Sequence, residues 1–366
     1  MNEETLQVSR AEVAHLHAFF HLLGQGRIAM GNALGKPDGE ALPLNAIRRV
    51  EHDGERLYQL ADSEVIIHHS TRGDIRIPRE DFAQAAAYLV ERYRAAEAEQ
   101  VDITGLQGFL DALDIFDLQA RTDDRTAFHI RLFHPSTPFL GVRLQSALGL
   151  WLPLLDGGRT ANLKLEQGGV RFSQPAVQKI NALGEEDGTA DVARRMLYIE
   201  SHGGTLRYND VADRVFRANL LMLDTNLPRI LCAMLRALHA DGTNKVTDLV
   251  AIMQEQNPLK MKDELVRKHG FYRYKLRQLL LALAWGMRPA KQFTGAQSPL
   301  DAYLVIGPQS EPVLFTRQRE QDFADYLLSH ARLELASPQE AHYGFLEREN
   351  GAYYFKLNLK IGLAKR

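Results

Sequence analysis

AFHIRLF at residues 127–133 and LGVRLQS at residues 140–146 are two short apolar runs joined by HPSTPF. The prolines and small polar residues of the joining segment predict a loop, so the two runs predict neighbouring β-strands. Further apolar patterns predict helices at 10–23, 80–100, 105–118, 215–240, 245–256, 271–286 and 321–331, and strands at 56–61, 64–69, 74–77, 302–307, 313–317, 343–348 and 352–361. This mixture predicts an α/β (α+β) fold in which a mixed sheet is flanked by helices, with an extra helical and C-terminal β region.

The composition is that of an ordinary globular protein, with 45% apolar and 25% charged residues. The first ten residues carry carboxylates rather than the basic residues of a secretory signal, and no apolar run approaches the roughly 18 residues of a membrane helix. We therefore expect a cytoplasmic protein without a membrane partner. The single cysteine, Cys232, excludes a disulfide within the chain and a cysteine zinc cluster, and its apolar surroundings predict a buried residue.

Positive charge is concentrated in one segment, although the net charge of the chain is only −2. Residues 258–292 contain nine Lys or Arg and two acids, a local balance of +7. This surplus predicts contact with DNA phosphates, and the alternative is a solvated face of amphipathic helices. The expected DNA-binding residues are Lys260, Lys262, Arg267, Lys268, Tyr272, Arg273, Lys275, Arg277, Arg288 and Lys291.

Two other patterns suggest sites only weakly. His17 and His21 have the spacing of a Zn²⁺-binding pair, but a third ligand and the HEXXH motif are missing, which favours packing histidines. The glycines at 157–158 and 203–204 lack the context of a phosphate-binding motif, which favours tight turns, although the first turn could approach DNA.

Several longer blocks resemble the HpaII family of type II restriction endonucleases, and they occur in the family's order over nearly the whole chain. They are FFHLLGQGRIA at 19–29, the segment 120–162, NLLMLDTNLPRILCAML at 219–235, FYRYKLRQLLLALAWGMRP at 271–289 with FTG at 293–295, DYLLSHARLELAS at 325–337 and YYFKLNLKI at 353–361. The resemblance implies a restriction endonuclease-like fold, Mg²⁺-dependent cleavage of double-stranded DNA at a short palindrome, CCGG for the namesake, and a homodimer. With it we expect an endonuclease-like core over 1–170 and a helical DNA-binding region with a C-terminal α/β elaboration over 171–366, packed as one body.

The positions that the resemblance assigns to catalysis are altered. Ala127 stands where the metal-binding Asp is expected, Arg143 stands at the polar position of the next strand, and Gln145 replaces the catalytic Lys. Glu12 of the first helix is retained, whereas His15 replaces a second acid. An alanine cannot bind a cation and the fixed charge of an arginine repels Mg²⁺, so the pattern predicts a degraded nuclease site.

We therefore expect a sequence-directed or modification-sensing DNA-binding protein that acts as a decoy, a regulator or a non-catalytic subunit beside an active nuclease. The sequence indicates no cofactor for it, and Mg²⁺ only if the endonuclease is active. One alternative is an active Mg²⁺-dependent endonuclease in which Asp123 or Asp124 supplies the lost carboxylate. The other is a non-catalytic assembly or regulatory protein without DNA affinity.

Overall fold

The computed structural model describes residues 5–68, 73–119, 126–184, 191–295, 300–307 and 311–364. The chain forms two compact units. Unit 1 is built from residues up to 152 and from 297–326, and unit 2 contains residues 153–296 and 327–364. This division differs from the expected 1–170 and 171–366, because residues 297–326 return to the first unit and hydrogen bond into its sheet.

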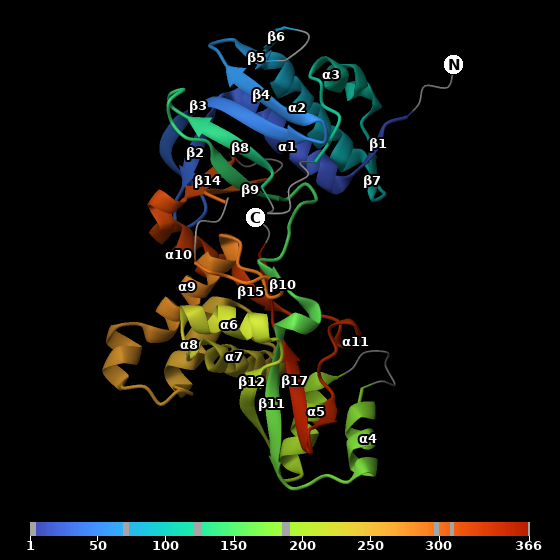
Figure 1. The fold of residues 1–366 in the computed structure, drawn as a ribbon, viewed down its shortest axis with the longest axis vertical. Helices are drawn as coiled ribbons and strands as arrows, with labels where there is room; N and C mark the ends of the chain where they lie inside the picture. Colours follow the sequence, from blue (N-terminus) through green and yellow to red (C-terminus); the bar gives the residue numbers. More distant parts are fainter. Residues whose placement is uncertain are drawn as a thin grey trace. The chain divides into compact units, whose positions relative to one another are not determined.

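Unit 1 begins with a helix whose ends are specified locally. Helix α1 (Arg10–Gln25) starts at Ser9, whose side chain and that of Glu12 form a capping box, and it ends at Gly26 in the left-handed conformation, φ 62°. Helix α2 (Arg79–Ala95) packs beside α1, and both lie against the sheet (Figure 1). The short strands β1 (Gln7–Ser9) and β7 (Gln100–Asp102) pair next to the start of α1.

A nine-stranded mixed sheet forms the body of unit 1, which confirms the expected fold class. Its order is β2-β14-β13-β9-β8-β3-β4-β5-β6, and β2 also pairs with β3, so the first six strands close into a circuit. Only the β13–β9 and β14–β2 pairs are parallel among these described strands. The strands are β2 (Arg27–Gly31), β3 (Pro37–Glu51), β4 (Gly54–Leu60), β5 (Glu64–His68), β6 (Ile75–Pro78), β8 (Phe128–Leu132), β9 (Leu140–Ser146), β13 (Ala302–Ile306) and β14 (Val313–Thr316).

The two faces of this sheet have different cores. Val142 and Leu144 of β9 belong to the large apolar core that includes α1 and α2. On the other face an aromatic cluster joins the sheet to α10 (Glu320–His330), with the rings of Phe315 and Phe323 stacked at 4.9 Å. Both faces of the central strands are therefore buried, as in mixed sheets covered by helices on both sides.

Two expectations for unit 1 were incomplete or wrong. Strands β2 and β3 were not predicted; Pro37, Gly39 and Pro43 interrupt the pattern of β3, which pairs with its sequence neighbour β2 and with the distant strand β8. The helix expected over 105–118 is a 3₁₀ turn, η1 (Thr104–Leu106), followed by α3 (Gln107–Ala112), and Asp114 with φ 58° follows the helix end.

Unit 2 is built on a four-stranded antiparallel sheet of order β12-β11-β17-β16. Asn350 and Gly351, with φ 47° and 87°, make the predicted hairpin turn between β16 and β17. The strands are β11 (Asn162–Gly169), β12 (Gly204–Val211), β16 (Leu346–Glu349) and β17 (Ala352–Asn358), and a small second sheet contains β10 (Leu155–Asp156), β18 (Lys360–Leu363) and β15 (Ala331–Glu334).

Among the helices of unit 2, α6, α7, α8 and α9 lie together beside the four-stranded sheet (Figure 1). The single helix expected over 215–240 is wrong, because the chain breaks at Asp224, whose carboxylate accepts the Asn226 N–H at 2.7 Å. The helices are α4 (Gln174–Ala182), α5 (Val192–Ser201), α6 (Arg214–Leu223), α7 (Leu227–Asp241), α8 (Val246–Gln256), the π-helix η4 (Glu264–Lys268), α9 (Phe271–Ala284) and α11 (Pro338–Ala341).

Two further features follow the sequence. Cys232 of α7 is buried, and burial raises the pKa of its thiol to about 12, so it behaves as a small apolar side chain. Over the described ranges, the helices are too short or too polar for any of them to cross a bilayer.

Candidate active site and nucleic-acid interface

Strand β9 places Arg143 and Gln145 on the same face of the unit 1 sheet, because alternate residues of a strand share a face. Arg143 is only 2% exposed and is paired in register with Tyr303 of β13. Its guanidinium carbon lies 5.4 Å from the centre of the Tyr303 ring, a cation–π contact. The expected polar position is thus occupied by a buried fixed positive charge.

Gln145 is completely buried. Its Nε2 donates to the carbonyl of Leu152 at 2.9 Å, so the side chain fixes the segment after β9. Its Oε1 accepts no hydrogen bond from the residues that the structure describes. A neutral amide at this position holds the chain and carries no charge to offset that of a phosphate.

Ala127 lies one residue before β8, and its N–H donates to the carbonyl of Val142 at 2.7 Å. The two strands expected from the sequence are therefore antiparallel neighbours, with Phe128 opposite Val142. The methyl group of Ala127 is 3% exposed and belongs to the apolar core. The position that the resemblance assigns to a metal-binding Asp is a core position in this chain.

Glu12 has a structural role at the start of α1. Its Oε2 accepts the Ser9 N–H at 2.6 Å and the Ser9 hydroxyl at 2.8 Å. Three residues along, burial and then the charge of Arg49 lower the pKa of His15 to about 4, so this side chain is neutral at pH 7. The retained acid caps a helix, and its neighbour adds no negative charge.

The Mg²⁺ that the family implies does not fit the residues at these positions. Mg²⁺ prefers carboxylate oxygens, and the described part of the chain contains no group of three or more His, Cys, Asp or Glu side chains arranged to hold a metal ion. Asp123 and Asp124 lie outside the described residues. Arg143 would in addition repel a cation at β9.

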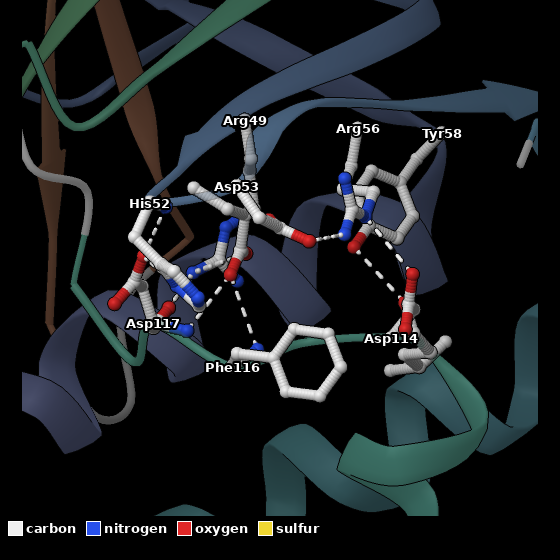
Figure 2. A network of polar contacts seen from close by, with 10 residues as sticks. Arg49, His52, Asp53, Arg56, Tyr58, Asp114, Phe116 and Asp117 are labelled. Atoms are coloured by element: carbon white, nitrogen blue, oxygen red, sulfur yellow. Dashed lines mark hydrogen bonds and ion pairs between the residues drawn. The ribbon is translucent and has the colours of Figure 1, made fainter. Parts of the chain in front are cut away.

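A network of buried charges that the sequence did not reveal lies at the β3–β4 hairpin (Figure 2). Glu51 is 4% exposed, and its Oε2 accepts the N–H groups of Phe116 and Asp117 at 3.1 and 2.7 Å. Arg49 donates to the carbonyl of Asp117 at 2.5 Å and lies 3.5 Å from the other oxygen of Glu51. These contacts fasten the segment after α3 to the hairpin.

The same network has two further ion pairs (Figure 2). Arg56 donates to Asp114 at 3.1 Å and to Asp53 at 2.6 Å. The carboxylate of Asp117 accepts the backbone N–H of His52 at 2.5 Å and lies 3.1 Å from its Nδ1. Because these carboxylates are engaged by arginines, a histidine and backbone N–H groups, they act as structural anchors. Except for the local Arg56–Asp53 pair, these contacts join residues about 60 positions apart, so no local spacing could have indicated them.

The basic segment of unit 2 is less positive than its composition suggests. Arg267 pairs with Asp263 at 2.7 Å and Lys268 with Glu264 at 3.2 Å, both at helical i,i+4 spacing. Lys275 pairs with Asp224 at 2.6 Å and is largely buried. The side chains of Lys260, Lys262, Arg273 and Lys291 are exposed, and those of Arg277 and Arg288 are half-buried.

The prediction that Tyr272 binds DNA is wrong. It is completely buried, its hydroxyl donates to Asn257 Oδ1 at 2.9 Å, and it accepts the Leu259 N–H at 3.3 Å. A ring enclosed in this way cannot stack on a base. Tyr274, two residues later, is 54% exposed and is the aromatic residue that α9 presents on its surface.

Asn219 of α6 organises the loop that carries Arg288 and Lys291. It is 1% exposed, and its amide donates to both backbone carbonyls at 2.9 and 2.8 Å. Its Oδ1 accepts the Phe293 N–H at 2.8 Å. One side chain therefore satisfies three backbone groups and fixes the path of two cationic residues, a role that the sequence did not indicate.

The glycine turns at 157–158 and 203–204 and the histidine pair of the first helix have structural explanations. A Cβ on Gly157 would lie 2.7 Å from Pro289, so this turn is a packing contact within unit 2. Gly203, with φ 82°, stands in the tight turn before β12. The rings of His17 and His21 are 5.7 Å apart, and His17 is 4% exposed, as expected for packing histidines.

Comparison with known proteins gives two matches to this chain. The family model described as HpaII restriction endonuclease matches residues 9–363. The type II restriction enzyme HpaII of Haemophilus parainfluenzae is 26% identical over 358 residues, which are 96% of this chain and 97% of that protein. No solved structure matches the chain.

Proposed function

Because this chain belongs to the HpaII restriction endonuclease family, we propose that it binds double-stranded DNA at specific sites and that its nuclease centre is degraded. The relative's name is that of a type II restriction enzyme, which cuts the DNA that it binds. In this chain the binding function persists and cleavage is lost. The protein acts as a DNA reader, as a regulator or as a non-catalytic partner of an active nuclease.

Arg143 is the observation that carries this proposal. A nuclease of this kind brings Mg²⁺ to the scissile phosphate, and that requires net negative charge at the metal position. Arg143 supplies a buried positive charge against Tyr303, and Ala127 contributes a methyl group to the core. A substitution at only one of these positions would leave a weakened enzyme. With both positions changed, none of the described residues there can bind the metal ion.

DNA binding is supported by the exposed cations of unit 2. Lys260, Lys262 and Lys291 form no ion pair with the described residues, and Asn219 holds the loop of Lys291. Lysines of this kind bind phosphates by releasing counterions, so affinity should fall steeply with salt. A homodimer would match the symmetry of a palindromic site.

The test is incubation of the purified protein with plasmid carrying CCGG sites, with Mg²⁺ and separately with Mn²⁺, beside a gel shift on the same DNA at low salt. We expect retardation without fragments. Discrete fragments would overturn the degraded centre and support an active endonuclease with a relocated carboxylate. Absence of retardation at low salt would overturn DNA binding and favour an assembly role. A duplex of equal length without CCGG is the control for sequence preference.

A further inference from the structure

Unit 1 contains a pocket of about 460 Å³ that the nuclease positions do not use. It opens where β8 ends and β9 begins, and its walls come from the strands of the closed circuit. Its volume lies in the range of about 300–1,000 Å³ that is usual for small-molecule sites. Leu140 at the pocket precedes Arg143 by three residues and Gln145 by five, roughly 10 and 17 Å along a strand, and none of the altered residues lines the pocket.

Phe133 at the pocket has an unusual conformation. Its φ is 62°, a left-handed value that is unfavourable for a bulky side chain, and its ring is 56% exposed. The conformation is held by its N–H, which donates to the Pro43 carbonyl at 2.9 Å, and by Thr137, whose hydroxyl donates to the Leu132 and His134 carbonyls. The chain thus accepts backbone strain and exposes a large apolar ring, a combination that marks functional positions.

The charged groups at the pocket neutralise one another. Asp301 lies 3.9 Å from Arg317, and Arg319 forms ion pairs with Asp38 and Asp322. A free phosphate would need uncompensated cations, so the site suits a neutral polar ligand. Asp301 is 38% exposed at its side chain and accepts one hydrogen bond, from Gly141 at 3.3 Å, which leaves carboxylate lone pairs to accept from a ligand N–H.

We propose that this pocket receives one unstacked nucleobase, with its ring against Phe133 and an amino N–H donated to Asp301. The apolar walls of Met30, Leu132 and Leu140 exclude water from the ring. Acceptance by a carboxylate favours bases with an exocyclic amino group over thymine. The inference rests on the proposed function as a DNA-binding protein. The base comes either from a nucleotide extruded from bound DNA or from a free nucleoside.

The experiment uses the full chain, a duplex that carries 2-aminopurine opposite a mismatched base, and free deoxyguanosine. 2-Aminopurine fluoresces weakly while stacked, so we expect its emission to rise when the protein binds. Phe133→Gly removes the ring and suits the left-handed backbone, so it tests the ring without adding strain. Phe116→Ala removes another exposed aromatic of unit 1, 53% exposed, and is the matched control.

An emission rise that Phe133→Gly abolishes and Phe116→Ala retains supports an extruded base. Deoxyguanosine binding that Phe133→Gly weakens about tenfold supports the free nucleoside as the source. The proposal that the pocket binds a nucleobase would be overturned by either of two results. One is the absence of both the emission rise and nucleoside binding; the other is that both signals are the same in Phe133→Gly and in the parent protein. A gel shift on the same duplex separates the two proposals, because retardation without either signal overturns only the pocket, whereas loss of retardation overturns DNA binding.

Discussion

The guanidinium carbon of Arg143 lies 5.4 Å from the ring centre of Tyr303, its register partner on the neighbouring parallel strand. A buried arginine is stable only if its charge is compensated, and the aromatic face contributes to that compensation. The same strand position in an active nuclease would have to tolerate a metal ion nearby. In this chain the position that the resemblance assigns to the nuclease site is therefore a packed one.

Restoring the family's carboxylate at position 127 is expected to harm the protein rather than revive it. Ala127→Asp places a carboxylate in the apolar core, so we expect the free energy of unfolding to fall by about 2–4 kcal/mol and no Mg²⁺-dependent cleavage to appear. Urea unfolding and the plasmid assay measure both effects. Cleavage by this variant would show that position 127 faces a metal site after all.

Replacing Glu12 tests whether it acts as a cap. Glu12→Ala removes the acceptor of two Ser9 hydrogen bonds, so we expect a loss of about 1 kcal/mol in stability with unchanged DNA affinity. Thermal unfolding and a gel shift give the two readouts. Glu91→Ala on the exposed surface of α2 is the control. A fall in DNA affinity at equal stability would contradict the capping role.

The lysines before η4 should determine the salt dependence of DNA binding. For Lys260→Ser with Lys262→Ser, we expect the slope of log K against log salt to decrease by about 0.9 for each phosphate contact that is lost. Lys179→Ser on α4, which lies away from α8 and α9 within unit 2 (Figure 1), is the matched control. An equal slope in the double variant and the parent would place the DNA elsewhere.

Asn219 should affect DNA affinity indirectly, because it fixes the loop that carries Arg288 and Lys291. Asn219→Ala leaves two carbonyls and one N–H without their partner, so we expect about 2–4 kcal/mol of destabilisation and weaker DNA binding. Hydrogen exchange at Phe293 and a gel shift measure the two effects. If exchange accelerates while affinity is unchanged, Arg288 and Lys291 do not contact DNA.

Acid should destabilise unit 1 through its buried histidines. Burial lowers the pKa of His17 to about 3 and that of His15 to about 4, while both take up protons near pH 6.5 in the unfolded chain. The unfolded state therefore binds more protons below pH 6.5, and stability falls by up to about 1.4 kcal/mol per pH unit for each group. Urea unfolding between pH 7 and 4.5 should show a shallower decline for His17→Leu. A parallel decline in both proteins would contradict this assignment.

The fold could be predicted where the information is local. Strands β8 and β9 lie within one residue of the predicted 127–133 and 140–146, because their apolar patterns and the joining prolines act over a few residues. Strand β3 was missed because Pro37, Gly39 and Pro43 interrupt its apolar pattern, and one of its partners, β8, lies far along the chain. The aromatic pocket residue Phe133 gave no signal, because its left-handed backbone depends on distant carbonyls such as that of Pro43.

The candidate site could likewise be predicted only in part. The alterations at Ala127, Arg143 and Gln145 are visible in the sequence, but only burial shows that they are packed positions. Tyr272 was assigned to the surface from its basic neighbours, although its spacing to Leu276 and Leu279 places it on the inner face of α9. Composition indicated a charge of +7, and the ion pairs of Arg267, Lys268 and Lys275 show how much of it is compensated.

The return of residues 297–326 to unit 1 has a consequence for biosynthesis. While the ribosome makes the intervening segment, at about 5–20 residues per second, the edges of β2 and β9 lack β14 and β13 for roughly 10–30 s. Unpaired edges of this kind invite association with other nascent chains. The first unit to emerge therefore cannot be completed until most of unit 2 has been made, and its yield in the cell should depend on chaperones that shield those edges until residue 316 has left the exit tunnel.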